Sequence, residues 1–85
     1  MKEDTIVKVA KVLEEWNPLG EKAKTVEALN GYRVEAIDIL ATLGVFYHNN
    51  IEEAISGIVG QAFNINLIES EVKLAAEKIK KILDN

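Results

Sequence analysis

Two pairs of acidic residues are candidates for acid–base catalysis or cation binding. Glu35 and Asp38 are three residues apart, so on a helix their carboxylates would share a face and could act together as acid and base or hold a hard cation. Glu52 and Glu53 form a second pair. If they lie in the first turn of a helix, the positive end of the helix dipole explains their presence. Neither pair has the histidine of the Glu-x-x-His motif that di-metal bundles use. We therefore expect no metal ligands and no cofactor.

The side chains needed for nucleophilic catalysis are scarce. The sequence has a single histidine, His48, and no cysteine. Ser56 and Ser70 both fall in predicted helices, without the glycine pattern of a nucleophile elbow. We interpret His48 as a turn residue that is satisfied by local hydrogen bonds, and we predict that the protein is not an enzyme.

A third group combines aromatic and acidic side chains around a turn. Trp16-Asn17-Pro18 ends one predicted helix, and Tyr32 opens the next helix with Glu35 one turn further on. An indole, a phenol and carboxylates on one rim could grip a peptide or a small ligand. The alternative is structural, with both aromatic residues plugging the domain and the carboxylates in solvent. The candidate binding residues are Trp16, Asn17, Tyr32, Glu35 and Asp38.

Length and composition predict a single helical domain covering residues 1–85. Of these 85 residues, 48% are hydrophobic and 28% charged, which is typical of a globular protein. The acidic net charge of −4 has the wrong sign for nucleic acid phosphates or an anionic membrane, and the lysines near the C-terminus are interleaved with glutamates. We therefore expect neither nucleic acid nor membrane as a partner. The lack of cysteine and of any targeting segment favours a cytoplasmic protein.

Apolar residues recur at helical spacing in four segments, near residues 5–16, 32–43, 51–63 and 67–83. Residues 21–31 are interpreted as a loop with room for a short helix. The run Val45-Phe46-Tyr47 is interpreted as a buried connector, because no second strand is present to pair with it. The sequence thus predicts an all-α fold, a compact bundle of four main helices with short connections.

Residues typical of helix ends flank these segments: Asp4 or Thr5 before the first, Gly44 after the second, Asn50 with Glu53 before the third, and Asn66 with Glu69 before the fourth. Gly57 and Gly60 lie inside the third segment, without the lysine and strand of a phosphate-binding loop. Two glycines so close together in a helix indicate either the close approach of another element or a bend.

Apolar residues outside the core stripes point to an interaction surface. Four short helices need not bury them all, and the remainder would form a patch for a protein partner or a second copy of the chain. We therefore expect a protein-interaction or regulatory module, with a small-ligand or metal-binding domain using Glu35 and Asp38 as the alternative. These surplus positions are Val7, Val12, Val34, Ile39, Ile65, Ile68 and Leu74.

The turn and the helix that follows it also carry a family resemblance. Trp16-Asn17-Pro18-Leu19-Gly20, followed by Tyr32, Glu35 and Ala36, resembles a family of small helical proteins of Bacillus and related bacteria. Its members have a Trp-Asp-Pro-Leu turn and then an acidic-Tyr-x-x-Glu segment, whereas this chain has Asn17 in place of the aspartate and Asn30-Gly31 ahead of the tyrosine. The resemblance implies an all-helical fold, and because the family has no established activity, it implies no function.

Overall fold

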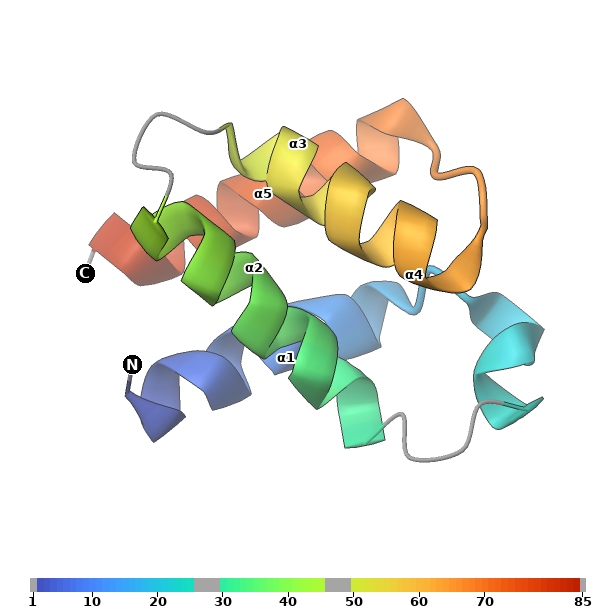
Figure 1. The fold of residues 1–85 in the computed structure, drawn as a ribbon, viewed down its shortest axis with the longest axis horizontal. Helices are drawn as coiled ribbons and strands as arrows, with labels where there is room; N and C mark the ends of the chain where they lie inside the picture. The colour runs from blue at the N-terminus through green and yellow to red at the C-terminus, as the bar shows by residue number, and fades with distance from the viewer. Residues whose placement is uncertain (1, 26–29, 46–49, 85) are drawn as a thin grey trace.

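Helices form where apolar residues recur at helical spacing, and the predicted all-α bundle is confirmed (Figure 1). The computed structural model describes residues 2–25, 30–45 and 50–84, and these ranges contain no strand. The helices are α1 Glu3–Trp16, α2 Arg33–Val45, α3 Ile51–Ile55, η3 Ser56–Gly60, α4 Gln61–Phe63 and α5 Glu69–Asp84, with the short 3-10 helices η1 Gly20–Thr25 and η2 Asn30–Tyr32. Because α3, η3 and α4 follow one another without a break, they form one helical segment. The described ranges thus hold the four main helices that the sequence predicts.

The four helical segments lie in two layers. In Figure 1, α2 and the α3–η3–α4 segment cross in front of α1 and α5. The latter two helices run in opposite directions and pack together, so that the end of α1 lies beside the start of α5. The Cα radius of gyration, 11.8 Å, is the value of a compact globule. None of the described helices has the length and apolar character needed to cross a membrane.

One apolar stripe on each helix builds the core. The stripe of α1 is Ile6, Val9 and Leu13, at the three- and four-residue spacing of one helix face. The other helices complete the core with Ala36, Ile39, Leu40, Ala54, Ile55, Val59, Val72, Ala75, Ala76 and Ile79. Ile39, one of the surplus apolar positions, is thus buried in the core. Val7, Val34, Ile68 and Leu74, from the same set, are exposed and form the part of it that the helices do not bury.

Some of the predicted helix ends are confirmed and others are wrong. Asn17 follows α1 in the left-handed conformation, with φ +50°, and its N–H donates to the Leu13 carbonyl at 2.7 Å. Asn50 caps α3, because its Oδ1 accepts the Glu52 N–H at 2.7 Å. Gly44 does not end α2, which continues to Val45.

The starts of α1 and α5 also differ from prediction. The N-cap of α1 is Lys2, without a side-chain hydrogen bond, and Asp4 lies in the first turn, where it pairs with Lys8 at 3.2 Å. The helix α5 begins at Glu69, and the backbone carbonyl of Ile68 accepts its first intrahelical hydrogen bonds. The expected capping box of Asn66 with Glu69 is therefore not formed.

The two glycines of the third segment coincide with a change of helix type. Gly57 and Gly60 both lie in η3, a π-helical turn between α3 and α4. A Cβ on Gly60 would make ordinary contacts, 3.6 Å from the Ile65 carbonyl oxygen, and one on Gly57 would meet nothing within 4 Å. Of the two predicted roles, the structure therefore agrees with a local distortion of the helix rather than with close packing. Of the predicted connector Val45-Phe46-Tyr47, Val45 is instead the last residue of α2. Phe46, Tyr47 and the turn residue His48 lie outside the described residues.

Candidate functional site

Tyr32 joins the turn after α1 to the start of α2. Its side chain is 2% exposed, and its hydroxyl donates to Asn17 Oδ1 at 2.7 Å and accepts the Leu19 N–H at 3.2 Å. The ring packs edge-on against Phe63, with centroids 6.4 Å apart and planes at 87°. We call Asn17, Leu19, Tyr32 and Phe63 the tyrosine junction. Both hydrogen bonds of the Tyr32 hydroxyl are thus made inside the protein, as expected of a structural residue.

The backbone of Tyr32 is strained, which fits the same role. Its φ is +64°, a left-handed value that bulky residues rarely adopt, and the preceding Gly31 has φ +62°. Such a conformation persists where the surroundings hold it, and here both hydrogen bonds of the phenol do so. Burial raises the pKa of the Tyr32 phenol further above neutral pH, where a phenol is already protonated, so the hydroxyl remains the donor to Asn17.

Trp16, the other aromatic residue of the predicted rim, belongs to a different neighbourhood. Its indole Nε1–H donates to Glu71 Oε1 at 2.7 Å, on α5. The ring is half-buried between α1 and α5, whereas Tyr32 is buried under α1 and α2. The structure thus brings Asn17 and Tyr32 together and directs Trp16 to a separate surface.

The two predicted carboxylates differ in exposure. Glu35 is only 9% exposed, and its Oε1 is buried without a hydrogen-bond partner among the residues that the structure describes. Burial raises the pKa of the Glu35 carboxyl, and the nearby charge of Asp38 adds to the rise. Asp38 itself is exposed. The structural alternative, in which both carboxylates lie in solvent, therefore holds for Asp38 but not for Glu35. In the part of the chain that the structure describes, no three acidic or histidine side chains are grouped as metal ligands.

A groove between α1 and α5 surrounds Trp16. Its volume is about 240 Å³, and its lining combines apolar side chains with charged residues on both helices. Leu74, one of the lining residues, is 54% exposed. We call this the Trp16 groove, lined by Val12, Glu15, Trp16, Glu71, Leu74, Ala75 and Lys78.

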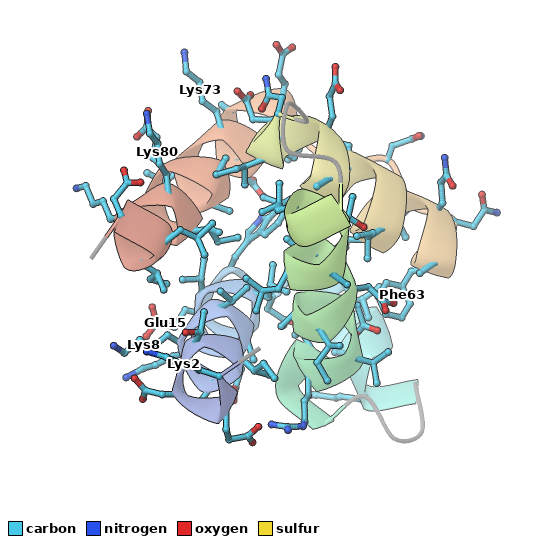
Figure 2. The ribbon with its side chains drawn as sticks, turned by 60° about the vertical axis from the view of Figure 1, so that its left-hand side comes forward. Lys2, Lys8, Glu15, Phe63, Lys73 and Lys80 are labelled. Carbon is cyan, nitrogen blue, oxygen red and sulfur yellow. The ribbon has the colours of Figure 1, made fainter. Side chains whose placement is uncertain are left out.

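The charged side chains of the groove were not among the predicted site residues. Glu71 lies three residues before Leu74 and Lys78 four residues after it, so all three share one face of α5. That spacing is visible in the sequence, but only the packing of α1 beside α5 shows that the face borders Trp16 and Val12. Figure 2 shows Glu15 and Lys8 on the outer flank of α1, while Lys73 and Lys80 point away from α1 on the other side of α5.

A larger and more open hollow lies on the other flank of α1, beside the start of α2. Its volume is about 550 Å³, and its lining includes Val7, Gly31 and Arg33. The Arg33 guanidinium contacts both carboxylate oxygens of Glu3 at 2.6 Å, and this pairing lowers the pKa of Glu3. Of the two cations that line this hollow, Arg33 is thus already paired with Glu3, while Lys11 lies beside Glu14 and Glu15 in the same lining.

Comparison of the chain with protein-family models, with curated proteins and with solved structures found no match. The resemblance to the Bacillus family stays a prediction. Its motif nevertheless has a local structural explanation, since Asn17 accepts from Tyr32 and an aspartate oxygen could accept the same hydrogen bond.

Proposed function

We propose that this protein is a non-enzymatic interaction module that receives an apolar side chain of a partner protein in the Trp16 groove. The observation that carries the proposal is the position of Leu74. This residue is 54% exposed beside a half-buried indole, in a hollow that charged side chains surround. Protein interfaces commonly have this composition, an apolar and aromatic centre with a polar rim.

The size of the groove supports a protein partner over a small molecule. Pockets that enclose small ligands measure roughly 300–1,000 Å³ and bury most of the ligand. The Trp16 groove, at about 240 Å³, has room for one or two side chains of another helix. Trp16 is suited to a central contact, because its indole N–H is already held by Glu71 and its ring is therefore fixed before a partner binds.

The alternative function, a small-ligand or metal site using Glu35 and Asp38, has one observation in its favour. Glu35 Oε1 is buried and unpartnered, so a ligand donor could satisfy it. Against this, Asp38 is exposed while Glu35 is buried, and neither residue lines one of the hollows described above. The Trp16 groove is therefore the better-supported site.

Photo-crosslinking tests the proposed function directly. A photoreactive amino acid in place of Lys78 lies on the rim of the groove, and the same replacement at Lys73 lies on the other side of α5. We expect position 78 to form an adduct with a protein, in purified samples or in extract of the source cells, that position 73 does not form. Leu74→Lys should remove that adduct. Equal labelling from both positions, or no adduct at position 78, would contradict the proposed function.

A further inference from the structure

We propose that the occupant of the Trp16 groove is a second copy of this chain, docked about a two-fold axis close to Leu74. This inference rests on the proposed function and names its partner. A two-fold interface needs one surface that carries both a projecting side chain and the hollow that receives it. The Trp16 groove has both, because one of its lining residues, Leu74, is 54% exposed, whereas Val12 and Trp16 are half-buried and Ala75 is buried.

The charges of α5 around Leu74 are arranged for such a pairing. Glu71 lies about one turn before Leu74 and Lys78 about one turn after it, on the same face of the helix. When two α5 helices cross antiparallel at Leu74, the acidic turn of each copy meets the basic turn of the other. Two Glu71–Lys78 contacts then form, related by symmetry, on either side of the apolar centre.

The acidic residue that α1 contributes to the groove lies at the same end as that of α5. The end of α1 lies beside the start of α5, so Glu15 lies at the same end of the groove as Glu71. The groove therefore has an acidic end, with Glu15 and Glu71, and a basic end at Lys78. A two-fold axis places the acidic end of one copy on the basic end of the other. A partner of uniform charge would meet like charge at one of the two ends.

Two charge-reversed variants test this arrangement through their mixture. Lys78→Glu alone places two acidic side chains opposite each other in a homodimer, and Glu71→Lys alone places lysine opposite lysine. In a heterodimer of the two variants, both cross-contacts join opposite charges. By sedimentation equilibrium we expect a wild-type dimer, a dissociation constant about ten-fold or more higher for each variant alone, and recovery of most of that loss in the equimolar mixture.

Two further variants serve as controls. Lys73→Glu makes the same charge change on the side of α5 away from the groove and should leave the dimer intact. Leu74→Lys should give a folded monomer, because the side chain is exposed and the helix itself does not need it. Far-UV circular dichroism would confirm that all four variants remain helical.

Several results would overturn the second-copy assignment. These are a wild-type protein that stays monomeric at high concentration, a mixture no tighter than its separate components, and a Lys73→Glu effect as large as that of Lys78→Glu. The proposed function can be tested separately from the second-copy assignment. If the protein is monomeric and position 78 still crosslinks to another protein, only the second-copy assignment fails. If position 78 forms no adduct and the wild-type protein is also monomeric, the groove has no protein partner.

Discussion

The tyrosine junction and the Trp16 groove contain adjacent residues of one turn, but they differ in environment. Asn17 binds Tyr32 in the interior, where the phenol has both of its hydrogen bonds inside the protein. Trp16, one residue earlier, leaves its ring half-buried beside the exposed Leu74. The sequence groups the two aromatic residues in one motif, but the fold places them in different environments.

Exposure and hydrogen bonding separate a structural aromatic residue from one that is available to a partner. Tyr32 is enclosed by α1, α2 and Phe63, so removing it leaves a cavity and unpaired polar groups. Trp16 has one flank against α1 and α5 and the other toward solvent. Mutations should therefore change stability at the first site and association at the second.

The largest expected effect is that of Tyr32→Ala. Loss of a fully buried aromatic ring leaves a cavity that its neighbours fill only in part, and we expect the free energy of unfolding to fall by about 3–5 kcal/mol. Urea denaturation followed by circular dichroism measures this change. Leu74→Ala is the matched comparison and should change stability by no more than about 0.5 kcal/mol. Equal losses at the two positions would remove the distinction between the regions.

Tyr32→Phe isolates the hydrogen bonds of the junction from its packing. The ring is kept, but Asn17 Oδ1 loses its donor and the buried Leu19 N–H loses its acceptor. We expect a loss of about 1–3 kcal/mol, the cost of leaving such groups unpaired, measured in the same denaturation experiment. A variant as stable as wild type would show that water replaces the hydroxyl and that the junction is held by packing alone.

Glu35→Gln should raise stability at neutral pH. Because burial raises the folded-state pKa of Glu35, the carboxyl binds its proton more tightly in the folded state than in the unfolded state. Its favourable contribution is present below the ordinary carboxyl pKa and is lost as pH rises through the raised value. The glutamine variant lacks this loss, so its stability should depend less on pH in denaturation series from acid to neutral pH.

Asp38→Asn is the control for that experiment. The charge of Asp38 raises the pKa of Glu35 less than burial does. Asp38→Asn should therefore also raise stability at neutral pH, but by less than Glu35→Gln. A larger effect from Asp38 than from Glu35 would contradict the assignment of the buried carboxyl.

Trp16→Phe should have a small effect on folding compared with the changes at Tyr32. The aromatic body stays between α1 and α5, and only the solvent-exposed hydrogen bond to Glu71 is lost. We expect a change of no more than about 1 kcal/mol in the free energy of unfolding, measured by circular dichroism because the variant has no tryptophan. A loss as large as that of Tyr32→Ala would mean that Trp16 is also structural and that the two regions do not differ.

Much of the fold could be predicted, because helix formation depends on local spacing. The apolar positions of α1 and α5 mark both helices, and Asn17-Pro18 marks the end of α1, as observed. Helix ends were harder, since Gly44 continues α2 and Asn66 does not cap α5. Helix ends fray and shift by one or two residues, so the preference of a single residue does not fix them.

The candidate site was predicted less well, because a site depends on contacts between segments far apart in the chain. The helical segments, the turn after Trp16, the acidic net charge and the surplus apolar residue Leu74 all follow from the order of the residues. The contact of Trp16 with Glu71, 55 residues away, and the burial of Glu35 beside an exposed Asp38 depend on how the helices pack. Helical periodicity fixes which residues share a face, whereas the partner of each face is set by how the helices pack.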